Sequence, residues 1–295
     1  MRNSSSLCLV ENYQNDDSLR AAYQKYVSKI FPGIDIEEWY RRGFWNDTYI
    51  PISLINSGEI VSNVSVAKMT VLFNGAEHSA LQISAVGTMP AYRNRGLSRK
   101  LLEYTLDKYR NEVSFFFLYA NETVLEFYPK FGFQPVMESV FITETEPDNS
   151  AYVARKLDIS KEVDYDLLQK LLNKRQAITE RFGATNYQNI TIWHIFNFYS
   201  DHLYYLEDPE ALLIKSEKDS VLHLYEIIFH DAFDLQSVLP KIIESDKIKS
   251  IRYYFPPDKL PFQFHSIQDD DTGLFILGDF NPGEEPFRFP VTAVT

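Results

Sequence analysis

The chain has 295 residues, and 45% of them are hydrophobic, which is enough apolar material for two compact cores. It carries 41 acidic and 29 basic residues, giving a net charge of −12. Proteins that bind the phosphate backbone of nucleic acids need a basic face, so this balance excludes nucleic acid as an expected partner.

Cys8 is the only cysteine, so no intramolecular disulfide can form, which is typical of a reducing compartment. Because it lies in an apolar stretch, we expect Cys8 to be a buried strand residue. The N-terminus lacks the basic-then-apolar layout of a signal peptide, and no apolar stretch approaches membrane-spanning length. We therefore expect a cytoplasmic protein with no membrane partner.

Hydrophobic periodicity predicts alternating strands and helices in the first half of the chain. Two hairpin signals, Asn56-Ser57-Gly58 and Asn74-Gly75, separate three apolar runs. The expected elements are a strand over 5–10, helices over 17–30 and 34–42, strands over 49–55, 60–73 and 80–86, a helix over 96–110, and a strand over 113–120.

The polar run Glu144–Ser150 is the best boundary signal in the chain. Beyond it, the expected elements are strands over 152–159, 211–214, 221–229 and 251–255, and helices over 166–175, 190–199 and 235–243. This order repeats the first half in outline, so we expect two domains, over residues 1–146 and 151–295. A closing strand or tail over 287–294 is expected to pack across their boundary.

The junction between the strand ending at Thr88 and the following helix carries the most specific motif. An apolar run stops at Pro90, and a loop with Arg93, Arg95 and Gly96 opens directly into the helix. Such a junction directs backbone N–H groups and the positive end of the helix dipole at one spot, which suits phosphate. The loop has neither the Gly-Lys-Ser/Thr end of a P-loop nor the three spaced glycines of a dinucleotide fingerprint.

The run Arg93-Asn94-Arg95-Gly96-Leu97-Ser98 resembles the Arg/Gln-x-x-Gly-x-Gly/Ala signature of the GNAT superfamily of N-acetyltransferases, whose loop grips the pyrophosphate of acetyl-CoA. Ser98 stands where that family prefers Gly or Ala. Downstream, Asn121 follows a buried strand, and Phe127–Phe133 is similar to the family's Tyr-x-x-x-Gly-Phe element. These motifs occur in the family's order and at its spacing within residues 1–145.

The resemblance implies an α/β (α+β) fold, with a mixed GNAT sheet and helices on both faces, followed by a second GNAT-like domain. Tandem GNAT proteins, including the Eis-like acetyltransferases, have this arrangement. After Phe229 the chain reads His230-Asp231-Ala232-Phe233-Asp234, without glycine or arginine, and its acidic residues would repel a pyrophosphate. We therefore expect residues 151–295 to be a degenerate domain that does not bind acetyl-CoA.

The resemblance also gives each motif a role, with acetyl-CoA as the co-substrate. The strand end at Val86, Gly87 and Thr88 would pair with the pantetheine arm, and one of its N–H groups would polarise the thioester carbonyl. Tyr128 would be the general acid for the departing thiolate, because a phenol with a pKa of about 10 keeps its proton at neutral pH. The expected cofactor-binding residues are Val86, Gly87, Thr88, Arg93, Asn94, Arg95, Gly96, Leu97, Ser98, Arg99 and Asn121.

Several of these residues also have ordinary structural interpretations. Arg99 and Lys100 either reach the 3′-phosphate of CoA or remain in solvent, and Asn121 either bonds the cofactor arm or only caps a helix. The general base is not identified. Glu77 and His78 open the strand that leads to the loop, where a solvated turn is the alternative interpretation.

In the GNAT fold, the region that lines the binding side of the acceptor amine here carries acidic and aromatic residues. They would suit a cation, or would form a packed helix with a solvent-exposed edge. These residues are Glu37, Glu38, Trp39, Tyr40, Phe44 and Trp45. The acidic surface is likewise compatible with a cationic amine, although it serves solubility equally well. The six histidines are scattered and Asp269–Asp271 lacks the spacing of a calcium loop, so we expect no metal.

The sequence therefore predicts an acetyl-CoA-dependent N-acetyltransferase that acts on a primary amine of a small molecule or peptide, by direct attack in a ternary complex. The alternative is a non-catalytic acyl-CoA-binding protein with a regulatory or interaction role. Acyl transfer from a charged tRNA is disfavoured by the excess of acidic over basic residues. Neither the acceptor amine nor the oligomeric state can be derived from the residues.

Overall fold

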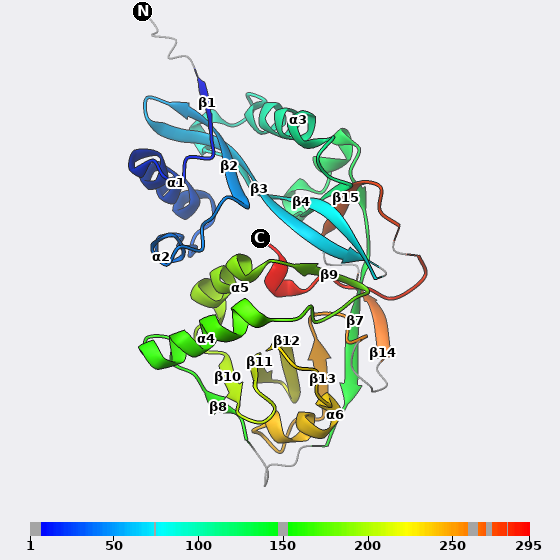
Figure 1. Ribbon diagram of the computed structural model, residues 1–295. Coiled ribbons are helices and arrows are strands. Elements are labelled where there is room, and N and C mark those ends of the chain that lie inside the picture. The colour runs from blue at the N-terminus through cyan, green and yellow to red at the C-terminus, as the bar shows by residue number, and fades with distance from the viewer. Residues whose placement is uncertain (1–6, 74, 147–152, 259–264, 270–272, 282) are drawn as a thin grey trace, which may run out of the picture.

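The computed structural model describes residues 7–73, 75–146, 153–258, 265–269, 273–281 and 283–295. Two mixed sheets with packed helices make up the fold, which confirms the expected α/β class (Figure 1). The helices are α1 (Asp17–Ile30), α2 (Glu37–Arg41), α3 (Leu97–Tyr109), α4 (Glu162–Lys174), α5 (Gln188–His194), which continues as a π-helical turn (Ile195–Tyr199), and α6 (Leu235–Val238).

The first sheet has the strand order β1-β2-β3-β4-β5-β15-β6 among the described residues, and β9 pairs with the far part of β3. Neighbours from β1 to β4 are antiparallel, whereas β4 and β5 are parallel, as expected beside the arginine loop. The strands are β1 (Cys8–Glu11), β2 (Tyr49–Asn56), β3 (Glu59–Phe73), β4 (Ala76–Thr88), β5 (Phe115–Tyr119), β6 (Gln134–Pro135), β9 (Phe182–Thr185) and β15 (Leu274–Gly278).

The second sheet has the order β14-β7-β13-β12-β11-β10-β8 over the part of the chain that the structure describes. Its centre repeats the first sheet, because β11 and β12 are antiparallel and β12 and β13 are parallel. The strands are β7 (Glu138–Glu144), β8 (Arg155–Lys156), β10 (Leu203–Leu206), β11 (Ala211–Lys218), β12 (Val221–Phe229), β13 (Ser250–Tyr253) and β14 (His265–Asp269).

Each sheet contains strands from the other half of the chain: β9 and β15 in the first sheet, and β7 in the second. β7, from the first half of the chain, pairs antiparallel with β13. β15, from the second half, pairs antiparallel with β5. In both cases the incoming strand lies beside the second member of the parallel pair. The expected domain ranges, 1–146 and 151–295, stay a prediction, since each sheet takes strands from both ranges.

Side chains of the first sheet alternate between two layers, as the period of a strand requires. Phe116 and Leu118 pack toward α3, whereas Phe115 and Phe117 pack toward the layer that holds α1 and α2. That second layer also contains α4, α5 and the end of the chain, which lie between the two sheets (Figure 1). Burying each large apolar side chain in this way stabilises the fold by about 1.5–3 kcal/mol.

Several sequence expectations need correction. Cys8 is exposed rather than buried, because β1 is an edge strand that pairs only with β2 among the described strands. Asn121 caps a 3₁₀ turn rather than a helix, and the expected helix over 235–243 is the short α6 followed by a 3₁₀ turn. Of the closing strand or tail expected over 287–294, the structure shows a tail, which ends in a 3₁₀ turn, Val291–Ala293. No helix in the described ranges is long and apolar enough to cross a membrane.

Candidate active site

A pocket of about 800 Å³ lies where β4 and β5 separate. The two strands pair only over a short stretch, in which Ala80–Gln82 of β4 lie beside Phe115–Phe117 of β5. Beyond that point both strands line the pocket, β4 with residues 83–88 and the end of β5 with residues 119–121. Sites for small molecules and cofactors typically measure about 300–1,000 Å³, so this pocket has the size of a ligand site.

A bulge shapes the β4 wall of the pocket. The register between β3 and β4 shifts between Asn63 and Ser65, and Ala85 has a positive φ of 47°. The Ala85 carbonyl accepts hydrogen bonds from Asn63 Nδ2 at 2.9 Å and from the Tyr26 hydroxyl at 3.3 Å. Because the carbonyl and the following N–H of one planar peptide point in opposite directions, the Val86 N–H points away from both donors.

A buried polar network holds Asn63 in place. Ser53 Oγ donates to Asn63 Oδ1 at 2.8 Å, and Asn63 Nδ2 donates to Ser65 Oγ at 2.9 Å. The hydroxyls of Tyr13 and Tyr23 extend the network, bonded to Ser53 at 2.7 Å and to Ser65 at 2.8 Å. A fully bonded buried network is rigid, so it fixes the bulge. The sequence analysis did not identify these residues, since polar residues in a strand carry no local signal of their partners.

The arginine loop turns sharply before α3. Asn94 and Gly96 both have positive φ, 61° and 71°. A Cβ at Gly96 would meet no atom within 4 Å, so backbone conformation rather than space requires the glycine. The first N–H groups of α3, which begins at Leu97, have no partner inside the helix and face the loop side.

Ser98, which departs from the family signature, has a partner in the fold. Its hydroxyl bonds Thr88 Oγ1 at 2.7 Å, and Thr88 Oγ1 in turn bonds Ser62 Oγ at 2.8 Å. This chain of hydroxyls ties the first turn of α3 to the end of β4. Here serine therefore supplies a structural contact that Gly or Ala could not make.

The structure separates the three arginines of the loop region. Arg93 lines the pocket and its Nε donates to the Thr88 carbonyl at 3.2 Å. Arg99 also lines the pocket, 3.6 Å from Glu103. Arg95 lies outside the described lining; it donates to the Ala91 carbonyl at 2.9 Å. All other residues of the expected cofactor-binding set line the pocket, including Asn94, Leu97 and Asn121.

Tyr128 lines the pocket from a 3₁₀ turn, Tyr128–Phe131, and is 5% exposed. Its ring packs against Phe127, Phe133 and Phe275, the last from the exchanged strand β15. Its hydroxyl makes no hydrogen bond to any residue in the described ranges. Burial raises the pKa of Tyr128 to about 12, so the phenol keeps its proton at neutral pH.

Asn121 caps the 3₁₀ turn that follows β5. Its side-chain oxygen accepts hydrogen bonds from the Thr123 N–H at 3.1 Å and from the Thr123 hydroxyl. Asn121 thus acts as a cap, and it also lines the pocket.

The acidic residues expected on the acceptor side do not reach the pocket. Of the group Glu37–Trp45, Trp39 alone is among the described lining residues. Glu38 instead accepts from Arg42 Nε at 2.7 Å and pairs with Arg41, and the hydrogen bond from Arg42 lowers the pKa of Glu38. Glu77 and His78, at the start of β4, also lie outside the lining.

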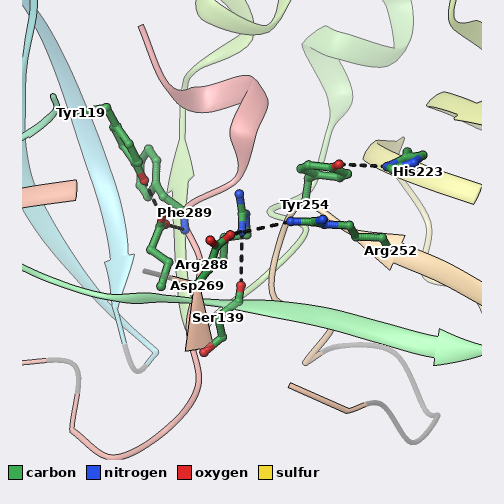
Figure 2. Close-up of polar contacts among 9 residues, drawn as sticks. Tyr119, Ser139, His223, Arg252, Tyr254, Asp269, Arg288 and Phe289 are labelled. Atoms are coloured by element: carbon green, nitrogen blue, oxygen red, sulfur yellow. Dashed lines mark hydrogen bonds and ion pairs between the residues drawn. The ribbon is translucent and has the colours of Figure 1, made fainter. Parts of the chain in front are cut away.

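The tail enters the site from the second sheet. Arg288 donates to Ser139 O at 3.4 Å and to Asp269 at 3.0 Å (Figure 2). The next residue, Phe289, donates from its N–H to the buried Glu138 at 2.7 Å. Glu138 also accepts from the hydroxyl of Tyr119, a lining residue of the pocket, at 2.9 Å. These contacts connect the tail to the end of β5.

Further along, the tail fills the corresponding separation in the second sheet. β12 and β13 pair only as far as Leu224 and Tyr253. Beyond them, Val291 N–H donates to the Tyr254 carbonyl at 3.1 Å, and Thr292 bonds Glu226 of β12. The tail thus occupies the place in the second sheet that corresponds to the pocket in the first sheet. The tail then ends at Thr295, which lines the first pocket.

Comparison with known proteins defines the class. Residues 15–136 match the family model described as "Acetyltransferase (GNAT) domain". A search of curated protein sequences found no match. The match covers the first part of the chain, which holds the splayed strands and the arginine loop.

Solved structures resemble almost the whole chain. A probable N-acyltransferase from Enterococcus faecalis V583, a conserved protein of unknown function, superposes with a TM-score of 0.60 at 11% identity, covering 92% of this chain and 72% of that one. A GCN5-related N-acetyltransferase from Kribbella flavida gives 0.55 at 14%, covering 92% and 70%. Eis1 from Mycobacterium abscessus gives 0.55 at 13%, covering 91% and 73%. The fold of almost the whole chain is thus shared with these proteins.

Proposed function

We propose that the protein is an N-acetyltransferase that moves the acetyl group of acetyl-CoA to a primary amine of a small molecule or peptide, by direct attack in a ternary complex. The observation that carries the proposal is a pocket lined at once by the bulged end of β4, the start of α3 and Tyr128. Holding amine and thioester in line supplies much of the rate gain in such a reaction.

The chemistry of the lining fits acetyl-CoA. The first turn of α3 and the charges of Arg93 and Arg99 suit its phosphates. Beyond Gln82, β4 has no strand paired on its β5 side among the described residues, so its backbone groups suit the amides of a pantetheine arm. The Val86 N–H is the donor we assign to the thioester oxygen, where negative charge develops.

Tyr128 is the proposed general acid. As the C–N bond to the acceptor forms and the C–S bond breaks, the sulfur takes the phenolic proton. The amine nitrogen gives up one proton, which restores the Tyr128 phenol. Burial raises the pKa of Tyr128 to about 12, so the phenol carries a proton to donate at neutral pH.

We further propose that residues 1–146 carry this chemistry and that residues 151–295 form a GNAT-like partner that holds no cofactor. The support is the tail that fills the separation between β12 and β13, together with the acidic residues after Phe229. The single cysteine is consistent with the reducing cytoplasm as the place of action.

A thiol-release assay tests the proposal. Purified protein is mixed with acetyl-CoA and a panel of primary amines, and CoA thiol is followed with a chromogenic disulfide, with an amine-free reaction as the blank. We expect amine-dependent release and a mass increase of the amine by one acetyl group. Tight binding of acetyl-CoA without turnover of any amine would instead support the non-catalytic acyl-CoA-binding alternative.

A further inference from the structure

We propose that the acceptor is a primary amine carried on an uncharged aromatic or branched aliphatic body, and not a polycation. The inference rests on the proposed acetyltransferase function, and it names the substrate class of the same pocket. We call the part of the lining contributed by α1, the segment before α2, and α5 the acceptor wall.

The acceptor wall is apolar. It is formed by the last turns of α1, the segment before α2, and α5 of the second half of the chain. Its main side chains are Val27, Ile30, Phe31, Ile34, Trp39 and Trp193. Aromatic and branched aliphatic side chains bind a partner mainly through buried apolar area and ring contacts. The body that this wall recognises is therefore itself apolar.

The acceptor wall is fixed before any ligand arrives. Asn197, in the π-helical turn after α5, accepts from the Asp35 N–H at 2.8 Å and donates to the Asp35 carbonyl at 3.1 Å. Trp39 Nε1 donates to the Asn189 carbonyl at 2.7 Å. These bonds join the two halves of the chain across the wall, so the apolar surface is rigid and binds without a large ordering cost.

No carboxylate side chain is available to a second cationic group. Among the described lining residues there is no aspartate or glutamate, and the charged side chains are Arg93 and Arg99, which repel cations. Glu38 of α2 is outside the described lining and is paired with Arg41 and Arg42. A polyamine would therefore leave a charge unpaired against apolar groups, which is strongly unfavourable.

The same wall favours the reactive form of the amine. An apolar surrounding disfavours the charged ammonium and lowers its pKa, so the nitrogen is bound with its lone pair free. The described lining also holds no histidine. Selection of the neutral amine by desolvation thus takes over part of the task of a general base.

A matched pair of acceptors tests the inference. Benzylamine and 1,4-bis(aminomethyl)benzene share one body, and the second compound adds a second ammonium group. With acetyl-CoA at saturation, we expect kcat/KM for benzylamine to exceed that for the diamine by about tenfold or more, because the second charge is desolvated. Spermidine serves as the flexible polycation and should be poorer still.

Variants of the wall test its location. Trp193→Glu places a carboxylate on α5, and Ile34→Glu places one on the segment before α2. Either change should reverse the preference between the two acceptors while leaving the Kd for acetyl-CoA within about twofold, since neither residue touches the arginine loop. Val163→Glu, on the exposed face of α4, is the matched control and should leave the preference unchanged.

The outcomes distinguish the two proposals. A higher kcat/KM for spermidine or the diamine than for benzylamine in the wild-type protein overturns the inference and leaves the acetyltransferase function standing. An unchanged acceptor preference in both folded wall variants, checked by their Tm, also overturns it. Acetyl-CoA binding without turnover of any amine overturns the proposed function itself.

Discussion

Thr295 and Gln82 are joined by two hydrogen bonds. The Thr295 N–H donates to Gln82 Oε1 at 3.1 Å, and Gln82 Nε2 donates to the Thr295 carbonyl at 3.5 Å. Gln82 is fully buried and is the last residue of β4 that pairs with β5. The tail is thus anchored at the point where the two strands begin to separate, at the base of the pocket.

Substitution of Gln82 by leucine should release the tail from the site. We expect the Gln82→Leu variant to lose about tenfold in kcat/KM for the amine, and about 1–3 kcal/mol in unfolding free energy, because buried backbone groups lose their partner. Steady-state kinetics and urea unfolding measure the two effects. Gln268→Leu, on the exposed strand β14, is the control; equal kinetics of the two variants would contradict a role of the tail in the site.

The two loop arginines should differ in their effect on cofactor affinity. Arg93 lines the pocket and Arg95 bonds the loop backbone outside it. Loss of a charged hydrogen bond to a phosphate weakens binding by about 1.5–3 kcal/mol, so Arg93→Ala should raise the Kd for acetyl-CoA about tenfold or more. Arg95→Ala should change it by about twofold at most. Titration calorimetry decides; a larger effect at Arg95 would show that the loop rearranges around the cofactor.

Tyr128→Phe removes the proposed proton donor without changing the packing of the ring. General acid catalysis contributes about 10²–10⁴-fold, so kcat should fall by about 100-fold while the Kd for acetyl-CoA stays the same. Because burial raises the pKa of Tyr128 to about 12, wild-type kcat should show no alkaline decline up to pH 10. Tyr104→Phe, at an exposed position on α3, controls for the loss of a hydroxyl. A decline that begins near pH 9 would point to a different acid.

His194 should make stability depend on pH. It donates from Nε2 to the Val294 carbonyl of the tail, and burial lowers its pKa to about 4. The folded state therefore favours the neutral ring. The free energy of unfolding keeps its full value above pH 6.5, and it decreases as the pH falls toward 4, because the unfolded state takes up the proton first. The shift corresponds to about 3 kcal/mol. Wild-type protein should lose this amount more than His194→Gln between pH 7 and pH 4 in urea unfolding, and parallel curves for the two proteins would refute it.

A buried ion pair should be essential for the position of the tail. Arg175 and Glu226 lie 3.1 Å apart, both nearly inaccessible to solvent, and Glu226 also bonds Thr292. Glu226→Ala leaves the arginine buried without its counter-charge, which destabilises by about 3–5 kcal/mol. Glu210→Ala breaks the exposed pair with Lys170 and should change stability by less than about 1 kcal/mol. Similar losses in both variants would contradict the difference in burial.

The local motifs could be predicted from the sequence because they depend on neighbours in the chain. The arginine loop, the helix after it and Tyr128 all derive from short runs in which strand, glycine and helix follow one another. The structure brings these runs to one pocket, as the motif order suggests. Only the orientation of Arg95 differs, since a hydrogen bond to Ala91 is not visible in a pattern of residue types.

The acceptor side could not be predicted, because it is assembled from distant parts of the chain. Trp193 comes from the second half, and nothing in its sequence context places it opposite β4. The interpretation of Glu38 as part of a cation site failed because Arg41 and Arg42, three and four residues further on, lie on the same helix face and neutralise it. Strand β15 was also missed, since its pairing with β5 joins residues that are remote in sequence.

The exchange of β7 and β15 has a consequence for biosynthesis. On the ribosome, β5 is made long before its neighbour β15, and β7 emerges before any partner strand of the second sheet exists. The nascent first half must therefore wait with an open sheet edge, a state that invites aggregation. The pocket acquires its lining residues Ile190, Trp193 and Thr295 only after the second half of the chain has been made. Assembly of the site thus waits for the second half of the chain, although the arginine loop and Tyr128 belong to the first half.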